Sequence, residues 1–323
     1  MTSVTSLFAP VDADLAQLVE NLKQLVGASH PILYAAAEHL FQAGGKRMRP
    51  AIVFLLSRAV SGGADISARH RRLAEITEMI HTASLFHDDV VDDAEVRRGV
   101  QTVNYRFGNR IAIQAGDFLF AQASWYLANL DNLEVVKLLS EVIKDFAEGE
   151  IQQGFSRFDT DVSLDSYLAK SYYKTASLIA NSAKAVGVLS EVSPGMATDL
   201  YEFGRAVGLA FQIVDDILDF TGTTDELGKP ACSDLKSGNL TAPVLFAMEE
   251  KPYLQVLIER ELQESGDLEE AIALVNNSQG IARSRVLAED FSAQALKRLE
   301  ILAPSSAKQA LVDLTDYILK RIY

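Results

Sequence analysis

Apolar residues recur at helical spacing along almost the whole chain. In the first such run, Leu15, Leu18, Leu22 and Val26 lie three or four positions apart, which predicts one buried face of a helix ending at Gly27. The same spacing predicts helices over 31–43, 50–61, 67–93, 111–130, 133–155, 164–186, 194–220 and 305–323, with shorter ones between 241 and 302. No alternating run is long enough to predict a strand, and the polar stretch 221–241 predicts a loop. We therefore expect an all-α protein in which residues 1–323 form a single domain.

Residues 111–130 are apolar or small on more than one helical face. A helix with that pattern is surrounded by other helices or lies in an interface. The segment therefore predicts a central helix and a dimer. Proline use agrees with long helices, because none of the 8 prolines falls between Pro50 and Pro194 and helix interiors exclude proline.

Composition narrows the class of protein. Acidic residues outnumber basic ones by 44 to 30, and a formal net charge of −14 argues against nucleic acid as a partner. The only cysteine, Cys232, excludes a disulfide within the chain or a multi-cysteine metal site and fits a reducing compartment. The first basic residue is Lys23, so the N-terminal segment does not resemble a targeting peptide, and no apolar run predicts a transmembrane segment. We expect a cytoplasmic protein.

Two predicted helices carry the same acidic motif, DDxxD, near their C-terminal ends. Like charges at i and i+4 of a helix repel one another, and the C-terminal end of a helix disfavours acids further. A divalent cation would relieve both effects, and ligands that are all oxygen favour Mg²⁺ over zinc. The alternative is two solvated acidic faces, but apolar flanking residues and the repetition favour the metal. The aspartates concerned are Asp88, Asp89, Asp92, Asp215, Asp216 and Asp219.

Cations gather near the same segments. The run GGKRMRP, from Gly44 to Pro50, places three of them at a glycine-rich turn before a helix, and others follow the two acidic motifs. Because Mg²⁺ and arginine both bind phosphate oxygens, the combination predicts a phosphorylated substrate. The alternative for lysines such as Lys46 is a solvated surface position. The cations that follow the acidic motifs are Arg97, Arg98, Lys229 and Lys236.

These motifs resemble those of the trans-type isoprenyl diphosphate synthases. The resemblance rests on DDVVDDAEVRRG (88–99), FQIVDDILDF (211–220), GGKRMRP (44–50) and the pair Lys174-Thr175. It implies a large antiparallel helix bundle around a deep central cavity, usually as a homodimer. It also implies a prenyltransferase that adds isopentenyl diphosphate units to an allylic diphosphate primer with Mg²⁺ as cofactor.

The resemblance assigns roles to individual residues. Asp88, Asp92 and Asp215 would ligate Mg²⁺, with Asp89, Asp216 and Asp219 in support. Arg97, Lys174 and Lys229 would contact the allylic diphosphate, and Thr175 and Gln212 would line the reacting centre. Residues Lys46, Arg49, His81 and Arg98 would hold the diphosphate of isopentenyl diphosphate.

The chain departs from the family pattern at one position. Many members carry a Gly-Lys pair after the second acidic motif, and here that pair is Gly238-Asn239, within SDLKSGNLTAP. Lys236, three residues upstream, is the sequence's candidate for the missing charge. The segment is similar to that of solanesyl and related long-chain synthases of oxygenic phototrophs.

Small residues precede the first acidic motif. Ala83 and Ser84 lie five and four residues before Asp88, where bulky side chains close the cavity of short-chain members. An open first turn predicts a long product, with Trp125 and Tyr126 as a floor further along. The alternative is that Ala83 and Ser84 are ordinary small packing residues and that the aromatics belong to the core.

The sequence thus predicts a solanesyl-type synthase that serves quinone side chains. A shorter-chain geranylgeranyl-type synthase, a class I terpene cyclase and a non-catalytic subunit of a heteromeric synthase are the rival readings. The second DDxxD and GGKRMRP argue against the cyclase, and two complete acidic motifs argue against a non-catalytic subunit. Because a long product would dissolve in lipid, the sequence is compatible with loose membrane association without an anchor.

Overall fold

The computed structural model describes residues 7–27, 30–42, 45–97, 99–222 and 231–321. The protein is 78% helical, which confirms the all-α prediction. Within the described residues the strands are β1 (Val96–Arg97) and β2 (Val100–Gln101), an antiparallel pair with Val96 opposite Gln101. This short hairpin occupies the turn that follows the first acidic motif, where the sequence predicted no strand.

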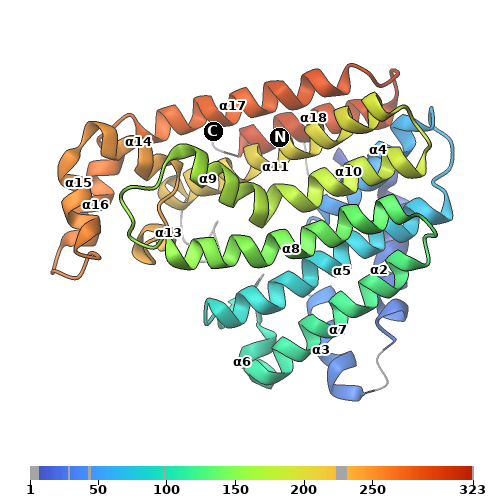
Figure 1. Cartoon of the computed structure of the whole chain (residues 1–323), viewed down its shortest axis with the longest axis horizontal. Helices are drawn as coiled ribbons and strands as arrows, with labels where there is room; N and C mark the ends of the chain where they lie inside the picture. Colours follow the sequence, from blue (N-terminus) through green and yellow to red (C-terminus); the bar gives the residue numbers. More distant parts are fainter. Residues whose placement is uncertain (1–6, 28–29, 43–44, 98, 223–230, 322–323) are drawn as a thin grey trace. The chain divides into compact units, whose positions relative to one another are not determined.

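The chain divides into two compact units, each assembled from separate segments of sequence. The first contains 1–143, 178–201 and 299–313, and the second contains 144–177, 202–298 and 314–323. Every one of these boundaries falls inside a helix. Figure 1 colours the helices by their position along the sequence, from blue at the N-terminus to red at the C-terminus.

The N-terminal helices of the first unit follow the apolar pattern closely. The short η1 (Ala9–Val11) leads into α2 (Asp12–Val26), whose buried face includes Leu18 and Leu22 and which ends where Gly27 adopts φ +53°. They are followed by α3 (Pro31–Gln42), α4 (Met48–Val60) and α5 (Ala68–Val91). Ser67 begins α5 by accepting a hydrogen bond from the backbone N–H of His70 at 3.3 Å.

Helix α5 is a long helix of this unit with many buried residues, and it carries the first acidic motif at its C-terminal end. It packs against α4 and against α7 (Asn109–Ala128), with the short α6 (Val103–Phe107) between β2 and α7. Only one face of α7 is buried, and Ile113 and Trp125 on the other are 41% and 65% exposed. The expectation of a helix enclosed on all sides is therefore wrong for the single chain.

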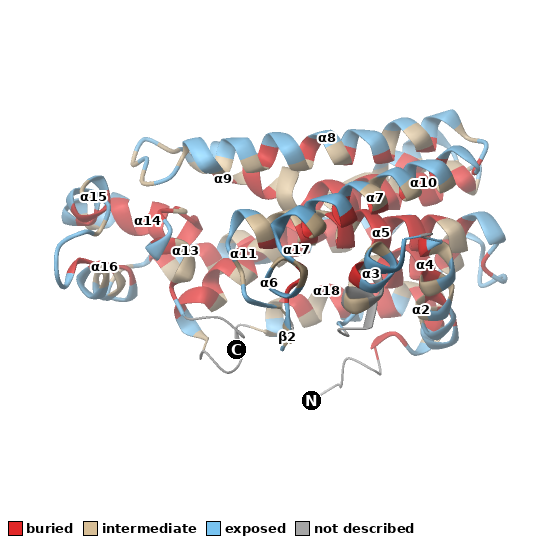
Figure 2. Ribbon diagram, turned by 90° about the horizontal axis from the view of Figure 1, so that it is seen from below, coloured by how far each residue is buried: buried red, intermediate tan, exposed pale blue. Residues whose placement is uncertain are grey.

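Helix α8 (Leu133–Phe155) has the predicted bounds and is mostly pale blue in Figure 2, with buried residues at intervals. The predicted helix 164–186 is instead three elements: α9 (Leu164–Ser171), the π-helical turn η2 (Tyr172–Ala176) and α10 (Ser177–Leu189). Next comes α11 (Pro194–Thr221), which carries the second acidic motif.

The remaining helices end the chain. The stretch expected to be a loop contains the one-turn helix α13 (Ser233–Lys236), while residues 223–230 lie outside the described part. The others are α14 (Ala242–Glu250), α15 (Pro252–Glu259), α16 (Asp267–Asn276), α17 (Gly280–Leu299) and α18 (Ser306–Lys320). None of the helices in the described ranges has the length and apolar character needed to cross a bilayer.

Candidate active site

The first acidic motif lies at the C-terminal end of α5. Asp92 caps the helix, and its backbone N–H donates to the carbonyl of Asp88 at 2.8 Å. Asp89 is fully buried and accepts a hydrogen bond from Nε of Arg97 at 2.6 Å, whereas Asp88 is half-buried and Asp92 exposed. Asp88 and Asp92 are therefore the carboxylates of this motif that remain accessible to an ion, and Arg97 holds the third.

Two predicted site residues, Arg49 of α4 and His81 of α5, lie side by side. Arg47, with φ +47°, caps α4 and forms an ion pair with Glu78 of α5. Arg49, two positions later, brings its Nη1 to 3.0 Å from Nε2 of His81. Lys46 lies exposed just before the helix. The predicted pair Arg49 and His81 thus shares one place on the facing sides of α4 and α5.

The second acidic motif lies near the end of α11, in the second unit. Asp216 is 3% exposed and accepts hydrogen bonds from the hydroxyl of Tyr167 at 2.5 Å and from Nε2 of Gln212 at 2.8 Å. Asp215 forms an ion pair with Arg321 at 2.7 Å. Asp219, also buried, accepts from the hydroxyl of Ser233 and the backbone N–H of Asp234, both at 3.2 Å.

Negative charge accumulates around Asp216. Burial, followed by the nearby charge of Asp234, raises the pKa of Asp216 to about 7, although the hydrogen bonds from Tyr167 and Gln212 oppose the shift. Burial also raises the pKa of the Tyr167 hydroxyl well above 10, so this group stays a hydrogen-bond donor. The surroundings of Asp216 would therefore be stabilised by an added cation.

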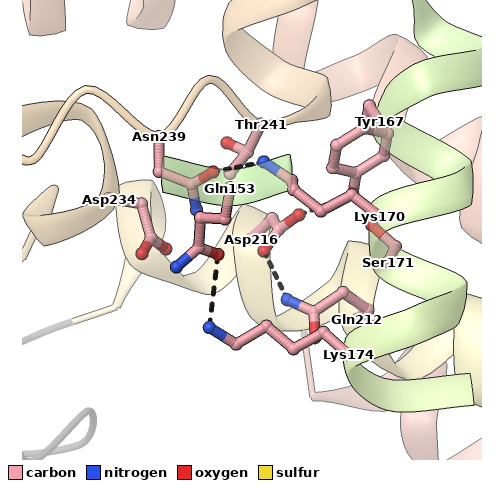
Figure 3. Close-up of a pocket in the computed structure, with 10 residues that line it drawn as sticks. All are labelled: Gln153, Tyr167, Lys170, Ser171, Lys174, Gln212, Asp216, Asp234, Asn239 and Thr241. Carbon is pink, nitrogen blue, oxygen red and sulfur yellow. Dashed lines mark hydrogen bonds between the residues drawn. The ribbon is translucent and has the colours of Figure 1, made fainter. Parts of the chain in front are cut away.

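A small polar pocket opens beside Asp216 (Figure 3). Lys174 of η2 donates to Oε1 of Gln153 at 3.2 Å and lies 3.0 Å from a carboxylate oxygen of Glu150. Thr175 donates to Oε1 of Gln212 at 2.6 Å, so these two predicted residues are joined directly. The pocket is lined by Gln153, Tyr167, Lys170, Ser171, Lys174, Gln212, Asp216, Asp234, Asn239 and Thr241.

Sequence reasoning missed several of these residues. The residues that were not predicted include Tyr167, Lys170 and Ser171. They lie at helical spacing from Lys174, so the polar helix face that leads to the Lys174-Thr175 pair could have indicated them. Asp234 lies in the stretch expected to be a loop, so no periodicity could place it. Lys236, the sequence's candidate cation, has an exposed side chain and does not line the pocket.

Two predicted site residues, Arg98 and Lys229, lie outside the described residues. Of the two residues expected to control product length, Ala83 is fully buried in α5, and Ser84 is half-buried and donates to the carbonyl of His81 at 2.9 Å. Their role stays a prediction. Of the aromatics proposed as a cavity floor, Trp125 is exposed, and Tyr126 donates to the carbonyl of Leu25 at 3.2 Å.

Comparison with known proteins now decides the family. Residues 30–275 match the model of the polyprenyl synthetase family, a range that includes both acidic motifs and the pocket. The chain belongs to the polyprenyl synthetase family. It is therefore a prenyltransferase, as its motifs predicted.

Individual members of the polyprenyl synthetase family match over nearly the whole chain. A prenyl transferase from Synechocystis sp. is 66% identical over 323 residues, covering 100% of both chains. Solanesyl diphosphate synthase 1, chloroplastic, from Arabidopsis thaliana is 56% identical over 323 residues, covering 99% of this chain and 80% of its own. The crystal structure of a polyprenyl synthase from Caulobacter crescentus, complexed with calcium and isoprenyl diphosphate, aligns with a TM-score of 0.91 at 33% identity and covers 99% and 98% of the two chains.

Proposed function

We propose that the protein elongates an allylic diphosphate with isopentenyl diphosphate to a solanesyl-length, all-trans polyprenyl diphosphate that supplies quinone side chains. The observation that carries this proposal is the 56% identity, over nearly the whole chain, to a protein named solanesyl diphosphate synthase. Both complete acidic motifs and the polar pocket at Asp216 support catalytic competence.

The residues fit Mg²⁺ as the cofactor. The donors are carboxylate oxygens, which suit this ion, and burial together with the nearby charge of Asp234 raises the pKa of Asp216. Among the described residues no three His, Cys, Asp or Glu side chains are grouped so as to hold an ion unaided. This agrees with an ion that takes part of its shell from phosphate oxygens and water.

The accessible aspartates are assigned to that ion. By the family resemblance, Asp88 and Asp92 on α5 would ligate Mg²⁺, and so would Asp215 on α11, where the ion would replace the contact of Asp215 with Arg321. Asp89, Asp216 and Asp219 support these ligands through their own hydrogen bonds. When bound, Mg²⁺ supplies Lewis-acid stabilisation of the negative charge that develops on the departing diphosphate.

Basic side chains bind and orient the two substrates. Lys174 and Arg97 face the allylic diphosphate in this assignment, while Arg49 and His81, already paired, hold the diphosphate of isopentenyl diphosphate with Lys46. Fixing both substrates converts the encounter of two molecules into a reaction within one complex.

The chemistry is an exchange of one bond for another. The allylic C–O bond breaks, and its electrons leave with the diphosphate. The double bond of isopentenyl diphosphate attacks the resulting allylic cation, and the new cation loses a proton to the released diphosphate. Thr175 and Gln212, joined at 2.6 Å beside Asp216, provide polar groups at the reacting centre.

We assign the control of product length to residues of α5. Ala83 and Ser84 leave the turn before Asp88 without a bulky side chain, which gives a growing product room in that direction. Replacing Ala83 by Phe should shorten the product, as measured by chromatography of the dephosphorylated alcohols. Ala74 on the same helix, also fully buried but farther from Asp88, provides a matched A74F control for overpacking. Unchanged product length in A83F would contradict the assignment.

The whole chain is proposed to act as one catalytic domain in a homodimer. The exposed apolar side chains Ile113 and Trp125 on α7 support a subunit contact on that face. A cytoplasmic location and loose association with membranes through the product stay predictions.

Incubation of purified protein with Mg²⁺, isopentenyl diphosphate and each allylic primer in turn tests the proposal. The expected product, after dephosphorylation, co-migrates with solanesol. Products that stop at geranylgeraniol would favour the shorter-chain alternative. No elongation with any primer would favour the non-catalytic subunit.

A further inference from the structure

Lys170 is a buried lysine that was not among the site residues predicted from the sequence. It lies on α9, is 9% exposed and lines the polar pocket beside Asp216. Figure 3 shows its ammonium pointing across the pocket to Asn239, and its Nζ donates a hydrogen bond to Oδ1 of that residue. Lysine is almost never buried without a partner, so this position calls for an explanation.

The partner of Lys170 is a neutral amide. Among the described residues, its ammonium forms no ion pair with a carboxylate, although Asp216 and Asp234 line the same pocket. An ammonium has three N–H donors, and one of them is used by Asn239. Burial lowers the pKa of Lys170, and the charge of Asp216 acts against that shift. Lys170 therefore brings both a positive charge and spare donors to the pocket.

Asn239 is the position at which the chain departs from its family. It stands where many members have the lysine of a Gly-Lys pair, and Gly238 before it adopts φ +78°. The chain lacks the cation at 239, yet the side chain found there holds the ammonium of Lys170. In this chain the ammonium beside position 239 comes from helix α9.

We propose that Lys170 supplies to the substrate diphosphate the positive charge that Asn239 lacks, with Asn239 orienting its ammonium. The inference rests on the proposed function, because it names a substrate-binding residue of the same site. It replaces Lys236 as the candidate, since Lys236 is exposed and outside the pocket lining.

A set of variants separates charge from structure. Lys170→Met removes the charge, and Lys170→Gln removes it but retains an N–H donor for Asn239. The double variant Lys170→Met/Asn239→Lys moves the charge to the position that the family uses. Lys144→Met, on an exposed part of α8, is the matched control for the loss of one lysine.

Binding of inorganic pyrophosphate in the presence of Mg²⁺ is measured by calorimetry, together with the KM for the allylic diphosphate and the melting temperature. K170M and K170Q should bind pyrophosphate about tenfold to a hundredfold more weakly, the effect of one charge-assisted hydrogen bond. The double variant should recover most of that loss, and K144M should bind as the wild type does.

Three results would overturn the inference. They are pyrophosphate affinity within about twofold of wild type in folded K170M or K170Q, a double variant no better than K170M, or a larger loss in K236M than in K170M. If K170M does not fold, the pyrophosphate affinities of K170Q and of the double variant test the inference instead. Absence of elongation by the wild type would instead reject the proposed function, whatever the pyrophosphate data.

Discussion

Asp89 and Asp216 hold the same place in the two DDxxD motifs, and both are buried. Asp89 is bonded to Arg97, and Asp216 to Tyr167 and Gln212. The aspartates that precede them, Asp88 and Asp215, are more exposed. Consecutive helical residues point in different directions. In each motif the second aspartate is held by hydrogen bonds at the helix end, and the first is the one that we propose as a metal ligand.

Asp88→Ala should lower turnover by about a hundredfold or more, because it removes an ion ligand, while the free energy of unfolding changes little. Asp89→Ala should instead destabilise the protein by about 1–3 kcal/mol, less than for a fully buried pair because Arg97 is partly exposed. Urea unfolding and steady-state kinetics on both variants measure the contrast. Near-normal turnover of D88A with saturating Mg²⁺, or of D215A tested beside it, would remove that residue from the mechanism.

His70 links stability to pH in the first unit. Burial lowers its pKa, and the nearby charge of Arg69 lowers it further, while Ser67 and Ser190 hold the two ring nitrogens at 2.7 and 3.0 Å. The unfolded state therefore binds a proton more readily than the folded state.

Stability from this group is present above the unfolded pKa of about 6.5 and falls as the pH drops through the folded pKa. Compared with the wild type, His70→Gln should raise the urea midpoint at pH 5.5 relative to that at pH 7.5, and this comparison isolates His70 from Asp216, whose pKa of about 7 acts in the same range with the opposite sign. Glu75, on the same helix, has a raised pKa and acts with the opposite sign. An equal pH dependence in H70Q and wild type would show that His70 does not cause it.

Among the elements, the π-helical turn η2 shows what local pattern could not predict. The sequence of residues 164–186 has an unbroken α-helical periodicity, but the backbone forms a π-helical turn at 172–176. This turn lies where Gly208 of α11 comes close to Ala176. A Cβ at Gly208 would lie 2.5 Å from Cα of Ala176. This close approach is a tertiary contact, which local periodicity does not predict. The same holds for the packing of helix α13 within the stretch 221–241. Helix 133–155, whose pattern needed no such contact, was predicted to the residue.

Gly208→Ala should force α11 and η2 apart, because the obstructing atom belongs to the backbone. The expected loss of stability is about 1–3 kcal/mol. Turnover should fall as well, since Thr175 and Gln212 are joined one turn away at 2.6 Å. The control is Gly195→Ala near the start of α11, where an added Cβ meets nothing within 4 Å and should be neutral or mildly stabilising. A fully stable and active G208A would contradict the close approach.

On the scale of the whole molecule, the segments of the two compact units alternate along the sequence. Their boundaries fall inside α8, α10, α11, α17 and α18. Because a helix melts cooperatively along its length, we expect the two units to unfold together.

Unfolding in urea should therefore give one transition. The only tryptophan, Trp125, reports on the first unit, whereas circular dichroism reports on helices of both. The two curves should coincide at a fixed protein concentration. Separate midpoints would show that the units unfold independently.

The sequence predicted the fold class and the two acidic motifs because both depend on local spacing. It predicted the pocket only in part. Lys174, Gln212 and Asp216 carry recognisable motifs, whereas Lys170 and Asp234 reach the pocket through the folding of separate segments. The net charge of −14 argued against nucleic acid but gave no sign of an anionic substrate, because the lysines proposed to bind that substrate are few.

A requirement for isopentenyl diphosphate distinguishes an elongating synthase from a cyclase. Pyrophosphate release and product length are measured with Mg²⁺ and an allylic diphosphate, with and without isopentenyl diphosphate. Release is expected only when isopentenyl diphosphate is present, with one pyrophosphate freed for each isoprene unit added to a product of solanesyl length. Sustained release from the allylic diphosphate alone, with no elongated product, would contradict this expectation and favour a cyclase.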